Sequence, residues 1–554
     1  LGYDLDVPSG AISGAFAIAG TPGSATTPDV GRLSLRAAVQ GDLVLGETWT
    51  GAYAVRAIPG TYDLVYSAVS AQASVPFNTL NILSTKVTVA NGASSVVDID
   101  VPMVTVSGTV TVGGRAAATS AGLGSVVLRR DPQGDEVPLL VGQGGTLTAR
   151  AIPGTYDVYY RAATAPAADA PRNRNLVVKT GVTLAMSGTT SLDLDIPSVP
   201  VGGRIAIGGV AGDKSQDAGI LVLRNASGDQ VELGPIATGS YSVRAAPGTY
   251  DVYYQTNQTK VTEPRNTNAR ALTGVTITPD GPNTLDIDVP LADVTGLLTI
   301  NGASVTSESE DVILFLENPE TADQVILSPT SFGSFAAKVV AGRYDIVYRG
   351  AANGKASTLV PRNKRAILRR GVTINGPALT SIDVDLPSVP LTGSLAMDGA
   401  ANAQSEGSFL LQGAADPDDV VDLGTVSQGH YALRLVPGTY DVVYDSGTSP
   451  RWTIQTGVTI EAATGTLDVD MQTFAIHGAL TLNGAAIAAP RDSGTLVLRQ
   501  RNKTTGTLVL GSTSAGSYSA RVPRGQYDVY YQVNTAGAHA PANADARLGC
   551  LRVP

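Results

Sequence analysis

A five-residue phrase, Pro-Gly-Thr-Tyr-Asp or a close variant, recurs six times along this chain of 554 residues. Its glycines are residues 60, 154, 248, 342, 438 and 525, so successive copies lie 94, 94, 94, 96 and 87 residues apart. This period has the size of a whole small domain and exceeds the roughly 20–50 residues of a solenoid repeat. The sequence therefore predicts six similar domains in tandem.

Each unit consists of short segments in which apolar and polar residues alternate. An opening strand carries one glycine, as in residues 106–112, and a closing strand such as residues 192–197 ends the unit. We expect about seven strands per unit and no helix, because the alternation has a period of two. Alternation leaves one face of each sheet buried, so two sheets should pack face to face. Linkers with two prolines in four residues, such as residues 197–200, predict a rod.

The glycine in the opening strand, the Pro-Gly-Thr-Tyr-Asp-Val phrase and the seven strands resemble the carboxypeptidase regulatory-like, transthyretin-like family. The resemblance implies an Ig-like β-sandwich in every unit. It also implies a non-catalytic module, usually extracellular, that serves as a spacer, stalk or adhesive element. The predicted fold class is thus all-β: six tandem seven-stranded Ig-like or transthyretin-like β-sandwich domains, the last one lacking its closing strand.

The repeat sets the expected domain boundaries. Residues 1–8 form an unpaired N-terminal strand before the first sandwich. The six sandwiches are expected at residues 9–103, 104–199, 200–291, 292–388, 389–472 and 473–554.

Composition disfavours several classes of function. With 38 Lys and Arg against 48 Asp and Glu, the net charge is −10, which argues against a nucleic-acid binder. One cysteine and three histidines cannot build a Cys- or His-rich metal centre. No apolar run approaches the roughly 18 residues of a membrane span, and no catalytic motif is present. We therefore predict no enzyme, no cofactor and no membrane span.

A basic residue precedes the aspartate of each phrase by seven positions. If the Pro-Gly were a hairpin turn, the two side chains would face each other across the strands and form a structural ion pair. A ligand-binding charge pair is the alternative. The predicted pairs are Arg56 with Asp63, Arg150 with Asp157, Arg244 with Asp251, Lys338 with Asp345, Arg434 with Asp441, and Arg521 with Asp528.

The closing strands carry Asp-x-Asp, as in Asp193 and Asp195. Two carboxylates on one exposed face could bind Ca²⁺, but a calcium site needs six to eight oxygen ligands. The favoured interpretation is a charged edge strand that discourages unwanted pairing.

A Pro-Arg-Asn loop occurs in three units, at residues 171–173, 264–266 and 361–363. Asn side chains in such loops commonly bond to backbone groups. Recognition of a glycan or a cell-surface protein is the alternative. The tyrosines in and just after the phrase, such as Tyr156 and Tyr160, are interpreted as core residues.

The phase of the repeat is anomalous at both ends. The chain opens on a closing-strand pattern with no domain before it, and the sixth unit ends without one. A free strand could complete the sixth domain of another copy by β-strand addition. The predicted donor residues are Tyr3, Leu5 and Val7. The predicted acceptor residues are Ile476, Leu480, Leu482 and Cys550, the last interpreted as a small buried residue.

Such a contact is head-to-tail, so it would generate an open filament. We therefore predict an extracellular or cell-surface structural subunit that polymerises with itself through its N-terminal strand. The alternative function is a multidomain adhesin or stalk that binds glycans or a protein through the repeated loops. The alternative explanation of the unpaired N-terminal strand is that the ends of the chain fall at this point of the repeat by accident.

Overall fold

The computed structural model describes residues 1–23, 30–69, 74–117, 120–212, 219–256, 263–305, 312–327, 333–350, 359–401, 407–447, 451–461, 465–485, 493–501, 507–535 and 540–554. The chain is all-β, as predicted; the described residues contain one short α-helix, α1 (Ser120–Leu123), and five three-residue 3-10 helices. It forms two compact units. The first comprises Leu1–Ala165, Val177–Ile196 and Gln472–Pro554, and the second comprises Pro166–Leu176 and Pro197–Met471.

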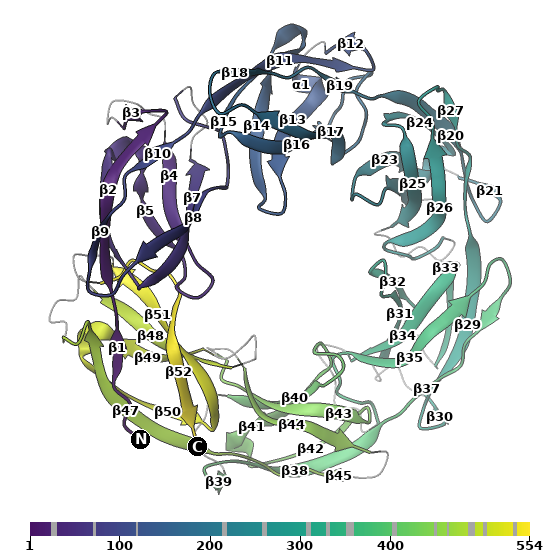
Figure 1. Ribbon diagram of the computed structural model, residues 1–554. Coiled ribbons are helices and arrows are strands. Elements are labelled where there is room, and N and C mark those ends of the chain that lie inside the picture. The colour runs from purple at the N-terminus through teal and green to yellow at the C-terminus, as the bar shows by residue number, and fades with distance from the viewer. Residues whose placement is uncertain are drawn as a thin grey trace. The chain divides into compact units, whose positions relative to one another are not determined.

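The first unit contains the strands of three sandwiches (Figure 1). The first sandwich has β2 (Gly10–Ile18), β3 (Thr21–Pro22), β4 (Gly31–Arg36), β5 (Leu43–Glu47), β6 (Ala52–Ala57), β7 (Gly60–Ala68), β8 (Asn81–Val89), β9 (Ser94–Val96) and β10 (Ile99–Val101). The second has β11 (Val104–Val112), β12 (Arg115–Ala116), β13 (Gly124–Arg130), β14 (Asp135–Val141), β15 (Thr146–Ala151), β16 (Gly154–Ala162), β17 (Leu176–Leu184), β18 (Thr189–Ser191) and β19 (Leu194–Ile196). The sixth has β47 (Thr473–Leu482), β48 (Ser493–Gln500), β49 (Thr507–Ser512), β50 (Ser517–Pro523), β51 (Gly525–Thr535) and β52 (Ala546–Val553), together with β1 (Leu5–Val7).

The second unit contains the other three sandwiches. The third sandwich has β20 (Val199–Ile207), β21 (Val210–Ala211), β22 (Ile220–Arg224), β23 (Gln230–Pro235), β24 (Ser240–Ala245), β25 (Gly248–Gln255), β26 (Ala269–Ile277), β27 (Asn283–Thr284) and β28 (Ile287–Val289). The fourth has β29 (Leu291–Ile300), β30 (Ala303–Ser304), β31 (Val312–Asn318), β32 (Asp323–Ile326), β33 (Ser334–Val340), β34 (Gly342–Gly350), β35 (Ala366–Ile374), β36 (Thr380–Ser381) and β37 (Val384–Leu386). The fifth has β38 (Val389–Met397), β39 (Ala400–Ala401), β40 (Ser408–Gly413), β41 (Val420–Thr425), β42 (His430–Leu435), β43 (Gly438–Asp445), β44 (Trp452–Ile460), β45 (Gly465–Thr466) and β46 (Val469–Met471).

Each sandwich is built from two sheets, and the first sandwich illustrates the plan. In one sheet the opening strand β2 pairs antiparallel with β6 and parallel with β9 and β10. The other sheet has the order β5-β4-β7-β8. In the second sandwich, two residue pairs between β14 and β15 join the two sheets into one. The opening strands begin beside the predicted domain boundaries, which themselves stay a prediction.

The Pro-Gly phrase is a corner between the two sheets and not a hairpin turn. In the first sandwich β6 ends at Ala57 in one sheet, and β7 begins at Gly60 in the other. β6 pairs with β2, whereas β7 pairs with β4 and β8. The strands that flank the phrase therefore do not face each other, which removes the basis of the predicted cross-strand ion pairs.

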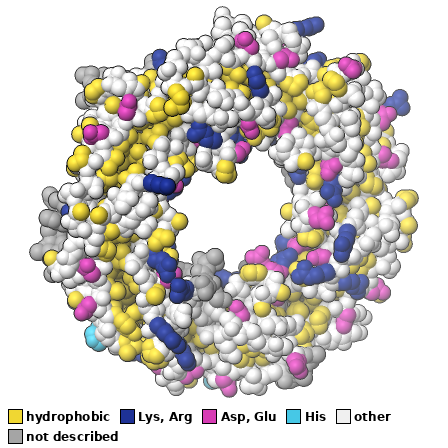
Figure 2. Space-filling view, in the orientation of Figure 1, with side chains coloured by type: hydrophobic (Ala, Val, Ile, Leu, Met, Phe, Trp, Pro, Cys, Tyr) yellow, Lys and Arg dark blue, Asp and Glu magenta, His cyan; other side chains and the backbone are white. Residues whose placement is uncertain are grey.

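The alternating residues form the cores between the sheets. In the first sandwich the core includes Ile12, Leu33, Leu35 and Val101, all at most 1% exposed. Tyr156 of the phrase and Tyr160, which follows the phrase in the same strand, are buried core residues, as predicted. On the face in Figure 2, acidic and basic side chains are interspersed among polar and apolar surface. Within the described ranges, no helix has the length and apolarity to cross a membrane.

Candidate functional site: the joint between the two ends of the chain

The sixth sandwich takes its closing strand from the opposite end of the sequence. β1 lies beside β47 in parallel (Figure 1), with Leu5, Asp6 and Val7 opposite Leu480, Thr481 and Leu482. The closing strand of the second sandwich, β19, pairs with β11 in the same parallel manner. β1 thus occupies the place that each other sandwich fills with its own strand.

The structure places this strand in the sixth sandwich of its own chain, whereas the sequence analysis expected a neighbouring copy. β1 and β47 belong to the same compact unit. Backbone hydrogen bonds extend the pairing: the Tyr3 amide donates to the His477 carbonyl (2.8 Å), and the Asn483 amide donates to the Val7 carbonyl (3.1 Å). The strand is therefore fully paired within one chain.

The Asp-x-Asp motif attaches each closing strand to its opening strand. Asp4 Oδ1 accepts the Ala479 amide (2.8 Å), and Asp6 Oδ1 accepts the Gly484 amide (2.8 Å) and the Thr481 hydroxyl (2.7 Å). The equivalent carboxylates in the other sandwiches accept the equivalent amides, and they are Asp98, Asp100, Asp193, Asp195, Asp286, Asp288, Asp383, Asp385, Asp468 and Asp470. Within the described ranges, no group of three or more His, Cys, Asp or Glu side chains is placed so that it could hold a metal ion.

The glycine of the opening strand allows the closing strand to approach. A Cβ at Gly478 would lie 1.8 Å from the Tyr3 carbonyl oxygen, a distance that no side chain tolerates. The same oxygen accepts the Tyr518 hydroxyl (2.9 Å), and burial raises the pKa of Tyr518 to about 12. In the second sandwich, a Cβ at Gly108 would meet the Leu192 carbonyl oxygen in the same way. The glycine in every opening strand is therefore a requirement of this joint.

The acceptor surface follows the prediction at three of four positions. Ile476, Leu480 and Leu482 are buried, but Cys550 is exposed. Cys550 lies opposite Asp528 in β51, and the buried neighbour Leu551 lies opposite Tyr527. The prediction for Cys550 was therefore one residue away from the buried position, and a shift of one residue moves a side chain to the other face of a strand.

On the donor side, Val7 is fully buried and Leu5 is half-buried. The hydroxyl of Tyr3 donates to the Arg552 carbonyl in β52 (2.9 Å). All three predicted donor residues thus lie against the sixth sandwich. The exposed Asp4 and Asp6 alternate with them.

The predicted ion pairs are wrong, because their members lie in strands that do not pair with each other. In three sandwiches the basic residue instead binds a serine in the linker before the opening strand: Arg56 donates to the Ser9 hydroxyl (2.9 Å), Arg244 to Ser198 and Arg434 to Ser388. In the sixth, Arg521 donates to the hydroxyl of Thr473, the first residue of β47. Lys338 pairs with Asp293 (2.8 Å).

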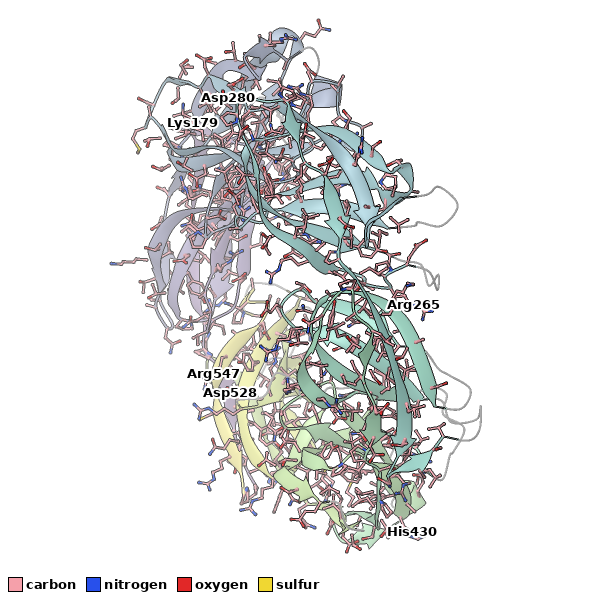
Figure 3. The ribbon with its side chains drawn as sticks, turned by 90° about the vertical axis from the view of Figure 1, so that its right-hand side faces the viewer. Lys179, Arg265, Asp280, His430, Asp528 and Arg547 are labelled. Carbon is pink, nitrogen blue, oxygen red and sulfur yellow. The ribbon has the colours of Figure 1, made fainter. Side chains whose placement is uncertain are left out.

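The aspartates of the phrase bind partners within their own sheet. Asp157, Asp251, Asp345 and Asp441 each accept the amide of a glycine in the next strand, namely Gly181, Gly274, Gly371 and Gly457. These glycines have φ near 70°, a conformation that favours glycine. In the sixth sandwich Asp528 pairs instead with Arg547 (2.8 Å), as Figure 3 shows.

The asparagine of the Pro-Arg-Asn loop inserts into the next sandwich. Asn173 Oδ1 accepts the Ala246 amide (2.8 Å), and its Nδ2 donates to Asp229 (2.5 Å) and to the Tyr250 hydroxyl (3.2 Å). Asn266 and Asn363 make the same set of bonds. The broader signal Pro-x-Asn, which also covers Asn78 and Asn543, could have revealed these junctions from sequence.

The fifth asparagine joins the sixth sandwich to the first. Asn543 Oδ1 accepts the Ile58 amide (2.8 Å), and its Nδ2 donates to the Tyr62 hydroxyl (3.0 Å) and the Gln40 carbonyl (2.6 Å). Asn543 is fully buried, and burial raises the pKa of Tyr62 to about 12. The two ends of the chain are therefore joined at two points, β1 in the sixth sandwich and Asn543 in the first.

The internal junctions differ from this end joint in one respect. Their asparagine donates to a buried carboxylate, such as Asp229, Asp323 or Asp419, where the end joint has a backbone carbonyl. Burial raises the pKa of all three carboxyls, that of Asp419 to about 6. These three junctions therefore each contain an acid that titrates at higher pH than usual.

We expect Asp419→Asn to flatten the pH dependence of stability. Between pH 6 and about 4, a carboxyl whose pKa is raised in the folded state binds more protons in that state than in the unfolded state. The parent therefore gains stability as the pH falls through this range. From pH 7 to pH 5 the gain in stability at this site should be about 1 kcal/mol. Chemical denaturation of both proteins at pH 7 and pH 5 measures it; an unchanged difference between the two pH values would contradict the assignment.

Comparison with known proteins adds little. No family model matches the chain, and no curated protein matches it. Among solved structures, the Bacillus anthracis TIE protein is 8% identical, with 81% of this chain and 73% of that chain covered and a TM-score of 0.14. A DUF3823 family protein from Parabacteroides merdae is 14% identical, with coverages of 50% and 98% and a TM-score of 0.15. BcpA, the major pilin subunit of Bacillus cereus, is 8% identical, with coverages of 51% and 99% and a TM-score of 0.13. At TM-scores of this size, these likenesses carry no argument.

Proposed function

We propose that the protein is a non-catalytic structural subunit and that β1 is its assembly element. Within one chain, β1 completes the sixth sandwich. Exchange of β1 between copies would join them head to tail into a polymer. The observation that carries the proposal is that β1 makes the full set of closing-strand contacts from the far end of the sequence.

Those contacts do not depend on which chain supplies the strand. Pro8 and Ser9 connect β1 directly to β2, just as the linkers between consecutive sandwiches connect a closing strand to the next opening strand. A strand from a second copy would therefore bring its own first sandwich to the same position. Exchange of an identical element between copies is a low-cost route to assembly.

Closure within a chain competes with exchange through effective concentration. A strand on the same chain meets its groove at a fixed effective concentration. Exchange between copies is therefore favoured over closure within one chain only when the protein concentration is high. A crowded surface layer offers that condition. A surface or extracellular location is part of the proposal, and the family resemblance of the repeats supports it.

The alternative function, an adhesin that binds through the Pro-Arg-Asn loops, is less favoured. The asparagines of these loops, Asn173, Asn266 and Asn363, are fully buried in contacts with the following sandwich. Their amide groups are therefore occupied.

Refolding tests the proposed function. The protein is unfolded in denaturant and refolded at low and at high concentration, and its mass is measured by sedimentation. We expect single chains at low concentration and integer multiples at high concentration. Leu5→Asp should suppress the multiples, whereas Asp4→Asn should keep them, because its amide oxygen can still accept the Ala479 amide. A parent protein that refolds only to single chains would refute the polymer.

A further inference from the structure

We propose that the surface of the first sandwich formed by Gln40, Ile58 and Tyr62 is a binding site for the Asn543 segment, and that this contact gives the joint its specificity. The inference rests on the proposed function of β1. The partner of this surface is the Asn543 segment of the sixth sandwich. That segment belongs to the same chain in the closed form, and to a second copy of the chain when β1 is exchanged.

The site consists of buried polar groups with matched partners. Asn543 is fully buried and satisfies three groups of the first sandwich. The Tyr62 hydroxyl also donates to the Ile58 carbonyl (2.5 Å), which fixes the acceptor that Asn543 meets. Backbone bonds flank the site, from the Ala542 amide to the Arg56 carbonyl and from the Ala544 amide to the Asp42 carbonyl (both 2.8 Å).

The same arrangement occurs where the order of sandwiches is fixed by the chain. Between the first and second sandwiches, Asn78 Oδ1 accepts the Ile152 amide (2.8 Å) and its Nδ2 donates to the Tyr156 hydroxyl (3.0 Å). The Phe77 amide donates to the Arg150 carbonyl (2.9 Å), as the Ala542 amide does to that of Arg56. The first sandwich thus presents the receiving surface of a sandwich that follows another.

β1 alone provides little discrimination. Its pattern, Leu-Asp-Val, is nearly repeated by the closing strands of the other sandwiches, such as Leu194–Ile196 and Ile287–Val289. If the place beside β47 were selective only for this pattern, it would bind any of these strands equally well. The Asn543 contact is made only when the strand in the groove is followed by a sandwich that presents this receiving surface, so it disfavours a strand that no such sandwich follows.

Competition by a free strand tests this specificity. A fluorescent peptide with the sequence of residues 1–8 is added in excess to the full chain, and its incorporation is followed by anisotropy. We expect slow uptake by the parent. Asn543→Ala should increase uptake at least about tenfold, since it removes three hydrogen bonds and leaves a buried amide unpaired. Tyr62→Phe should increase it less.

Matched controls separate specificity from general weakening. Asn78→Ala and Tyr156→Phe remove the equivalent bonds at the junction of the first and second sandwiches, where Asn78 donates to the Asp135 carboxylate in place of a backbone carbonyl. Because β10 stays attached to its own domain there, uptake should remain at the parent level. Equal uptake by Asn543→Ala and the parent, or equal increases in Asn543→Ala and Asn78→Ala, would overturn the inference.

A chain that lacks residues 1–8 distinguishes the two proposals. If this chain takes up the peptide while Asn543→Ala behaves like the parent, only the specificity role fails. If it takes up no peptide, strand complementation fails, and the inference is overturned with it.

Discussion

Val7→Asp is expected to release β1 from the sixth sandwich. The Val7 side chain is fully buried beside the core of that sandwich. Loss of a buried valine costs about 1.5–3 kcal/mol, and a charged carboxylate in an apolar site adds several kcal/mol. The joint should therefore weaken by more than about 100-fold.

Hydrogen exchange measures this release residue by residue. The Tyr3 and Asn483 amides, which donate to the His477 and Val7 carbonyls, should lose their protection, while the β48–β51 pairing keeps its own. Val96→Asp is the matched control, because Val96 is 75% exposed in β9. Parent-like protection of Asn483 in Val7→Asp would contradict the role of the buried side chain.

The structure also identifies which donor position is most sensitive. The sequence analysis named both Leu5 and Val7 as donor residues, and both lie on one face of the strand. Leu5 is half-buried, however, and Val7 is fully buried. Period-two alternation predicts which face a residue occupies, but the depth of burial depends on what the opposite sheet presents there. We therefore expect Val7→Asp to exceed Leu5→Asp in effect.

The spare strand could be predicted because its evidence is local in the sequence. The pattern at residues 1–8 matches five other closing strands, and the sixth unit lacks that pattern. Repeat phase alone therefore identified donor and acceptor. Whether the strand joins its own chain or another depends on where the two ends meet, and no local pattern carries that information.

Two other features could not be derived from the same patterns. Pro-Gly is compatible both with a hairpin and with a corner between sheets, so the predicted pairing of Arg56 with Asp63 had no independent support. The correct partner of Arg56, Ser9, lies 47 positions away in the linker. Cys550 was misplaced because it directly follows a glycine, as Val275 does in the third sandwich, whereas Leu551 is the residue that lies opposite Tyr527 as Val275 lies opposite Tyr250.

Gly478→Ala is expected to break the same joint from the acceptor side. Its new Cβ would lie 1.8 Å from the Tyr3 carbonyl oxygen. Because that atom is backbone, β1 must move away, and the bond from the Ala479 amide to Asp4 and the bond from the Tyr518 hydroxyl are lost with it. Loss of these bonds at about 1 kcal/mol each, together with the steric overlap, should release the strand. Gly549→Ala is the control, because Gly549 lies in the same sandwich and a Cβ there would have no neighbour within 4 Å.

Combining the two substitutions distinguishes a broken joint from a damaged acceptor. Mutations that remove the same interaction are not additive. Once Val7→Asp has released β1, the Tyr3 carbonyl no longer opposes a Cβ at position 478. Gly478→Ala should then lower the free energy of unfolding of the sixth sandwich by no more than about 0.5 kcal/mol. Chemical denaturation measures this difference. An equal cost in the parent and in the Val7→Asp protein would mean that Gly478 serves β47 itself, and that the close approach of β1 is not the reason for glycine at this position.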